Sequence, residues 1–210
     1  MADRWATFEC YGTLIDWNGG IRGQLARVFG AERADALLVR YHVLEPMLEA
    51  DDRRTYRDVL IEAMRGLGAP DEEEDALAGS LPDWQPFPEV REALEAARGR
   101  GWKLAILSNT DPDYVAASQE RIGVPFDQVI VASEIGSYKP ALGHWRTFEE
   151  QVGRLPDVHV AASLFHDVAP ANELGLPSIW INRLGETPGP QPTRELPDLT
   201  RLADTLEDVA

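Results

Sequence analysis

Polar residues that could carry out catalysis occur at four points along the chain, each close behind an apolar segment with the length of a β-strand. The four groups are Glu9 with Tyr11 and Thr13, Ser108 with Asn109, Lys139, and Asp167. Singly, Ser, Asn and Asp are ordinary residues of turns and helix starts. Together, the carboxylate, hydroxyl and ammonium groups have the types that nucleophilic and acid–base catalysis use. We therefore expect one shared active site.

The elements that must position these groups alternate between strand and helix. Apolar runs predict strands, and three- to four-residue spacing of apolar positions predicts helices between them. The expected strands are 5–8, 103–107, 128–131, 159–162 and 178–181, and the expected helices are 88–98, 112–121, 142–152, 168–174 and 199–210. Such alternation indicates a parallel α/β sheet. Ligands of such sheets bind outside the carboxyl ends of the strands, where the four groups fall.

A long insertion separates the first two expected strands. It spans about ninety residues, far more than an ordinary crossover connection, and it predicts four helices at 20–30, 32–50, 55–68 and 71–81. We interpret residues 17–87 as a helical cap and residues 1–16 and 88–210 as the core. The proline-rich stretch 186–197 predicts a loop.

Composition narrows the classes of function and partner. The net charge of −16 argues against nucleic acid as a partner, because phosphate binding requires basic patches. No apolar run reaches the roughly 20 residues of a membrane span, and the N-terminus lacks the apolar region of a signal peptide, so a cytoplasmic protein is expected. The single cysteine, Cys10, excludes an internal disulfide and is expected to be a small buried hydrophobic residue.

In order and spacing, the four groups resemble the four motifs of the haloacid dehalogenase superfamily across nearly the whole chain. The resemblance implies a Rossmann-like core with an inserted helical cap. It also implies five catalytic residues: Glu9, Thr13, Ser108, Lys139 and Asp167. Glu9 would attack the substrate, Ser108 would hydrogen-bond the site and Lys139 would hold the carboxylate charge. Physical chemistry agrees, because a carboxylate beside an ammonium stays ionised and oriented.

Tyr11 discriminates between branches of this superfamily. Phosphatases usually carry a second aspartate at this position and bind magnesium. A tyrosine, with a pKa near 10, is a poor general acid for an alkoxide leaving group, whereas a halide leaves without a proton. The chain thus resembles the L-2-haloacid dehalogenase (type II) branch, which uses neither metal nor cofactor. This implies an (S)-2-halo carboxylic acid or similar small anion as substrate, an ester intermediate that water hydrolyses, and a homodimer.

An anionic substrate and a halide product require positive charge or hydrogen-bond donors in the site. Arg40, followed five residues later by Glu45, resembles the helix whose arginine faces the halide in the dehalogenases. The alternative is an exposed arginine on a charged helix. Asn109 resembles the asparagine that helps to bind halide, and Tyr11 is the third residue that we assign to substrate or halide binding.

Two positions depart from the dehalogenase pattern. Leu164 stands where an asparagine is usual. His166 precedes Asp167 and either caps the following helix, which we favour, or belongs to the site. Glu9 stands where the nucleophile is usually aspartate, and its extra methylene shifts the carboxylate by roughly one bond in a reaction where a misplacement of about 1 Å can cost around a hundredfold in rate. Three interpretations stay open: a nucleophile with altered substrate geometry, an anion-binding protein without turnover, or a deliberately disabled enzyme. A phosphatase is the alternative activity.

Overall fold

The fold is built on one parallel sheet. A computed structural model describes residues 3–51, 53–187 and 189–209. Its six strands lie in the order β3-β2-β1-β4-β5-β6, and all neighbours are parallel. The strands are β1 Arg4–Phe8, β2 Trp102–Ser108, β3 Gln128–Val131, β4 Val158–Ala161, β5 Ser178–Ile181 and β6 Arg194–Leu196. The predicted α/β, Rossmann-like fold is confirmed, and β1 lies between the strands that carry the other motifs.

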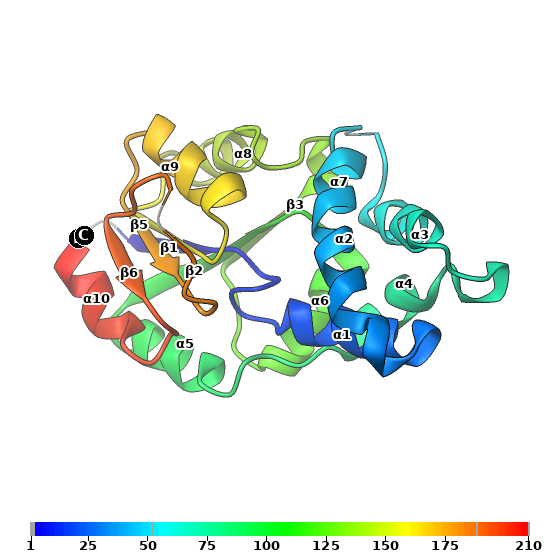
Figure 1. The fold of residues 1–210 in the computed structure, drawn as a ribbon. Coiled ribbons are helices and arrows are strands. Elements are labelled where there is room, and N and C mark those ends of the chain that lie inside the picture. Colours follow the sequence, from blue (N-terminus) through cyan, green and yellow to red (C-terminus); the bar gives the residue numbers. More distant parts are fainter. Residues whose placement is uncertain (1–2, 52, 188, 210) are drawn as a thin grey trace.

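Helices cover both faces of the sheet (Figure 1). One face packs against α5 Val90–Gly99, α6 Pro112–Ile122 and α10 Leu202–Val209, and the other against α7 Ala132–Ile135, α8 Gly143–Val152 and α9 Ala169–Glu173. Side chains alternate across a strand, so Phe8 packs in the apolar cluster that includes residues of α5, α6 and α10. Trp5 points to the other face, where its ring meets that of Phe148 in α8 edge-on, with the centroids 5.3 Å apart. This two-sided burial explains why the strands are almost wholly apolar. None of the helices in the described ranges is long and apolar enough to span a membrane.

The insertion between β1 and β2 is helical. It contains α1 Trp17–Phe29, α2 Ala31–Glu49, α3 Tyr56–Leu67 and α4 Ala76–Ser80, and Figure 1 shows α2 standing between the sheet and α3. The boundaries follow local sequence: Thr55 and Asp58 form a capping box that starts α3, and Gly68 ends it in the left-handed conformation, as glycine readily does. Helices therefore occur in all four predicted segments, while the division into two domains stays a prediction.

Three local predictions were wrong in detail. The stretch 186–197 is not all loop, because Arg194–Leu196 forms the short edge strand β6 beside β5; three residues between prolines carry too little pattern to predict a strand. The helix expected at 168–174 begins earlier, as a π-helical turn at Leu164–Val168 that leads into α9. The acidic run that begins the fourth predicted helix forms a separate 3₁₀ turn, Asp71–Glu73.

Candidate active site

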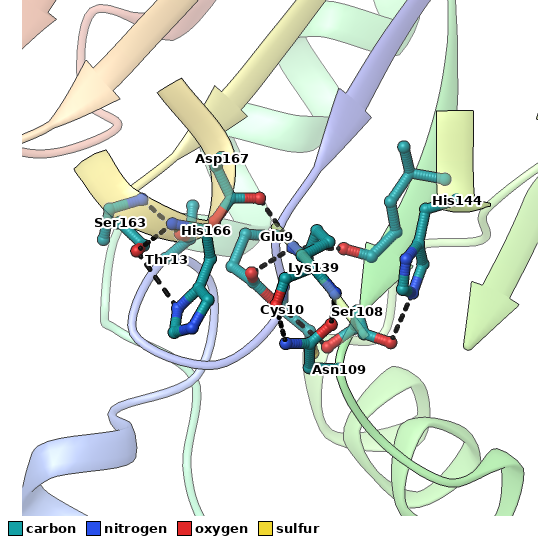
Figure 2. A network of polar contacts seen from close by, with 12 residues as sticks. Glu9, Cys10, Thr13, Ser108, Asn109, Lys139, His144, Ser163, His166 and Asp167 are labelled. Atoms are coloured by element: carbon teal, nitrogen blue, oxygen red, sulfur yellow. Dashed lines mark hydrogen bonds and ion pairs between the residues drawn. The ribbon is translucent and has the colours of Figure 1, made fainter. Parts of the chain in front are cut away.

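The four predicted groups meet at the carboxyl edge of the sheet (Figure 2). Glu9 directly follows β1, Ser108 is the last residue of β2, Lys139 lies in the connection after β3 and α7, and Asp167 lies in the π-helical turn after β4. All four side chains are buried. The parallel arrangement of three neighbouring strands places their carboxyl ends side by side, which explains how residues 158 positions apart in sequence reach one site.

Glu9 is held by three donors. Its Oε1 accepts hydrogen bonds from the backbone N–H of Cys10 at 2.9 Å and from the hydroxyl of Ser108 at 3.1 Å. Its Oε2 forms an ion pair with Nζ of Lys139. These contacts fix both oxygens of a carboxyl group that is 7% exposed and lines a cavity. Such a group is oriented as a nucleophile requires.

Lys139 joins the two acids of the site. Besides Glu9, its ammonium donates to Oδ1 of Asp167 at 2.6 Å and to the carbonyl oxygen of Leu107 at 2.9 Å. All three ammonium protons therefore have acceptors. The predicted pairing of Lys139 with the position-9 carboxylate is present in the structure, and the ammonium bridges to the last motif as well.

The two acids differ in their titration. Burial raises the pKa of Glu9 to about 8, although the Lys139 ammonium opposes the shift. Burial acts in the same direction on Asp167, but Lys139 and His159 outweigh it and hold the pKa of Asp167 far below its ordinary value. The Lys139 ammonium thus mainly compensates Asp167. The raised pKa of Glu9 means that its carboxyl group becomes a better nucleophile as the pH rises.

Two buried histidines support this network and were treated as ordinary residues in the sequence interpretation. Nε2 of His159 lies 2.8 Å from Oδ1 of Asp167, while its Nδ1 lies 2.8 Å from the hydroxyl of Thr7. His144 contacts the carbonyl oxygen of Ser108 at 3.0 Å through Nε2, and burial lowers the pKa of His144 to about 3. A neutral His144 donates this hydrogen bond. No motif in the sequence marks either histidine, since each sits in an apolar segment.

Thr13 positions the loop after β1 and is not part of the cavity lining among the described residues. Its hydroxyl accepts a hydrogen bond from the backbone N–H of Ala162 at 2.8 Å, and its carbonyl oxygen accepts one from Arg183 at 2.9 Å. These contacts tie the loop after β1 to the ends of β4 and β5. The structure gives Thr13 no direct contact with Glu9.

Tyr11 and Asn109 line the cavity as predicted, but their polar groups already have partners. The hydroxyl of Tyr11 lies 3.1 Å from that of Ser118. The side-chain amide of Asn109 donates to the carbonyl oxygen of Lys139 at 3.0 Å and to Oε2 of Glu49 at 3.1 Å. Both N–H groups of this amide therefore already have acceptors within the protein.

Arg40 lies outside the site, so its predicted role in halide binding is wrong for this structure. The residue is exposed on α2, and its guanidinium donates to the carbonyl oxygen of Gly66 in α3 at 3.3 Å. The buried face of α2 carries Tyr41, Glu45 and Glu49 instead, at the four-residue spacing of one helix face. Resemblance in sequence located the helix and did not fix its rotation.

The cavity has a volume of about 450 Å³ and lies between the sheet edge and the inserted helices. Its lining includes five residues of α1–α3 that the sequence interpretation did not assign to the site: Trp17, His42, Glu45, Glu49 and Tyr56. The four-residue repeat of buried positions in α2 was a signal for Glu45 and Glu49, but glutamates are rarely expected on a buried face.

His166 lies in the cavity wall, and the prediction that it caps the following helix was wrong. Ser163 supplies the cap, since its hydroxyl accepts the backbone N–H of His166 at 3.0 Å. Nε2 of His166 lies 3.7 Å from Oε2 of Glu49, and burial lowers the pKa of His166. Within the described ranges, no group of three or more His, Cys, Asp or Glu side chains is arranged to hold a metal ion.

Known proteins resemble this chain over most of its length. A family model described as haloacid dehalogenase-like hydrolase matches residues 6–163. The (S)-2-haloacid dehalogenase of Pseudomonas sp. (strain YL) is 29% identical over 220 residues, covering 97% of this chain and 94% of that protein. The phosphoserine phosphatase of Thermus thermophilus is 29% identical over 199 residues, covering 86% and 78%. The crystal structure of the L-2-haloacid dehalogenase RSc1362 has the same fold, with a TM-score of 0.87 at 22% identity and coverage of 99% and 100%.

Proposed function

The chain belongs to the haloacid dehalogenase-like hydrolase family, and we propose that it hydrolyses carbon–halide bonds through an ester formed on Glu9. The observation that carries this proposal is the position and orientation of the Glu9 carboxyl group. Its carboxyl group is buried at the sheet edge, is oriented by Ser108 and Lys139, and opens onto the cavity.

The reaction has two steps. In the first, a Glu9 carboxylate oxygen forms a bond to the substrate carbon, and the carbon–halogen bond breaks with its electron pair leaving as halide. In the second, water adds to the ester carbonyl of Glu9, which releases the alcohol product, one proton and the free carboxylate. The positive charge of Lys139 balances the negative charge of the site in both steps. Ser108 orients the Glu9 carboxyl group, which attacks in the first step and is attacked by water in the second, and Asp167 anchors Lys139.

The chemistry of the leaving group favours a halide over a phosphate ester. The position two residues after Glu9 is Tyr11, whose hydroxyl contacts Ser118, and burial raises the pKa of Tyr11 well above its ordinary value. Such a hydroxyl is a poor proton donor for an alkoxide, and a halide needs no proton. Magnesium-dependent turnover of a phosphate monoester would instead support the phosphatase alternative.

The similarity to an (S)-2-haloacid dehalogenase makes 2-halo carboxylic acids the reference substrates. Halide release from 2-bromopropionate and from its amide should be measured for the unmodified protein and for Glu9→Gln, whose amide cannot attack. We expect release with the unmodified protein, loss with Glu9→Gln, and faster release with Glu9→Asp, which restores the shorter side chain usual in the family. Equal release by the Glu9→Gln variant would refute the role of Glu9. Binding without release, even for Glu9→Asp, would support the non-catalytic alternative.

Two further properties stay proposals. A homodimer is expected from the family resemblance and is tested by sedimentation velocity. A cytoplasmic location is the second proposal and is tested by fractionation of the source cells.

A further inference from the structure

One wall of the cavity carries two buried carboxyl groups and no lysine or arginine among its described residues. This wall is formed by the buried face of α2, which presents Glu45 and Glu49 to the cavity. Each of these residues is 6% exposed. Two carboxyl groups withdrawn from water in one wall are costly unless something compensates them, and the compensation that the protein supplies is incomplete.

Glu45 is compensated at one oxygen. Its Oε1 accepts hydrogen bonds from the hydroxyls of Tyr41 at 3.0 Å and Tyr56 at 2.7 Å. Its Oε2 accepts no hydrogen bond from the described part of the chain. Burial raises the pKa of Glu45 to about 7, against the effect of the two tyrosines. The second oxygen is therefore open to a donor from a bound molecule.

Glu49 shows the same pattern. Its Oε2 accepts from the amide of Asn109 at 3.1 Å and lies 3.7 Å from Nε2 of His166. Its Oε1 has no donor among the residues that the structure describes. Burial, followed by the charge of Glu45, raises the pKa of Glu49 well above its ordinary value. Two neighbouring carboxyl groups in one wall thus each keep an unused acceptor oxygen.

The basic groups near the cavity are already neutralised. Of the described lining residues, Arg183 is the only arginine or lysine, and its guanidinium pairs with Glu89 at 2.7 Å and stacks over the ring of Phe87 at 3.6 Å. Lys139 is shared between Glu9 and Asp167. The charges of Arg183 and Lys139 are thus each paired with carboxylates of the protein, although Nε of Arg183 keeps no hydrogen-bond partner in the described ranges.

Aromatic residues also line the cavity. The cavity lining contains five of them: Tyr11, Trp17, Tyr56, Phe87 and Phe165. Tyr11 and Tyr56 are stacked with their centroids 6.3 Å apart. Faces of aromatic rings attract cations, and the attraction is strongest where water is excluded. Carboxyl groups with free oxygens and aromatic faces together are the chemistry that recognises an ammonium group.

We propose that the substrate of this site is a small organic molecule that carries a protonated amino group directed at Glu45 and Glu49. This inference rests on the proposed function for the reaction at Glu9 and changes the class of molecule that undergoes it. The ammonium ion supplies the charge and the N–H donors that the two carboxyl groups lack, and the reacting carbon lies on the Glu9 side of the cavity.

Binding of three matched probes tests this assignment without any reaction. The probes n-propylammonium, propionamide and propionate have the same number of carbon atoms and differ in charge, and none carries a leaving group. Their dissociation constants should be measured at pH 7.5 by saturation-transfer NMR titration of the whole protein. We expect n-propylammonium to bind at least about tenfold more tightly than propionate, with propionamide between them.

Substitutions of Glu45 and Glu49 test whether these two residues cause the preference for the ammonium probe. Glu45→Gln and Glu49→Gln keep the shape of each side chain and should each weaken ammonium binding about tenfold. The control Glu95→Gln, at an exposed position of α5 outside the cavity lining, should change it less than twofold. Propionate binding as tightly as n-propylammonium, no ammonium binding, or unchanged ammonium affinity in both buried variants would overturn the proposal. Because the probes cannot form an ester, a failure of the Glu9 reaction leaves this result unaffected, and an absent ammonium preference leaves the Glu9 reaction standing.

Discussion

The substitution Glu45→Gln should stabilise the protein in a way that depends on pH. Glu45 is buried and its pKa is raised from 4.5 to about 7, first because of burial. The raised value means that the folded protein keeps the proton that the unfolded chain loses above pH 4.5. The stability contributed by Glu45 is therefore fully present below pH 4.5 and is lost as the pH rises through about 7.

The size of the loss follows from the two pKa values. At about 1.4 kcal/mol for each pH unit, a rise from 4.5 to about 7 corresponds to about 3 kcal/mol of unfolding free energy. Glutamine does not titrate, and its carbonyl oxygen can still accept from Tyr41 and Tyr56, which bond to Oε1 of Glu45. At pH 8 the variant should be more stable than the unmodified protein by up to about 3 kcal/mol, whereas at pH 4.5 the two should be nearly equal.

Urea unfolding at pH 4.5, 6, 7 and 8 measures this difference. Glu95→Gln is the matched control, because Glu95 is exposed on α5, and substitutions at such surface positions change stability by at most about 0.5 kcal/mol. A Glu45→Gln variant that is less stable at pH 8 than at pH 4.5, relative to the unmodified protein, would refute the reasoning. That result would mean that Glu45 is ionised and well compensated in the folded protein.

Three further predictions concern the reaction and its charged centre. Since burial raises the pKa of Glu9 to about 8, kcat/KM for halide release should increase between pH 7 and pH 9, and a rate independent of pH in this range would contradict the assignment. Lys139→Met should abolish turnover and lower the unfolding free energy by about 3–5 kcal/mol in thermal unfolding, because it leaves Glu9 and Asp167 without their shared cation. The control Lys103→Met removes a lysine that is 41% exposed and should lower the unfolding free energy by less than about 1 kcal/mol. Ser108→Ala should lower kcat about tenfold with little change in KM, because its hydroxyl orients Oε1 of Glu9, and an unchanged kcat in steady-state kinetics would exclude that role.

The core of the fold and its charged centre were predictable because they follow strong local rules. Apolar runs of strand length located β1 to β5 to within one or two residues. Once those strands are parallel, the residues that follow them share one edge, and this rule alone brings Glu9, Ser108 and Asp167 together. The short edge strand β6 escaped prediction because its three residues have no periodicity that distinguishes them from a loop.

The far wall of the cavity could not be predicted from the sequence. The helix α2 was located correctly, but its rotation depends on packing against α1 and α3, and its apolar residues Val39, Val43 and Met47 are exposed while Glu45 and Glu49 are buried. Hydrophobic periodicity predicts that the apolar face of such a helix is buried, which is the opposite of what the structure shows for α2. Arg40 was assigned to the site by its resemblance to the dehalogenase helix, and the two glutamates were overlooked. The departure from the usual pattern is itself informative, because buried acids with raised pKa values that line a cavity mark candidate functional sites.

The covalent role of Glu9 is tested most directly by a single turnover in water enriched in ¹⁸O, with enzyme in excess over substrate, followed by mass spectrometry of the peptide that contains residue 9. If an ester forms on Glu9, water attacks its carbonyl carbon, so one ¹⁸O atom should appear in the Glu9 side chain while the alcohol product carries the original ¹⁶O. Label in the product and none in Glu9 would show that water attacks the substrate directly and would contradict the account.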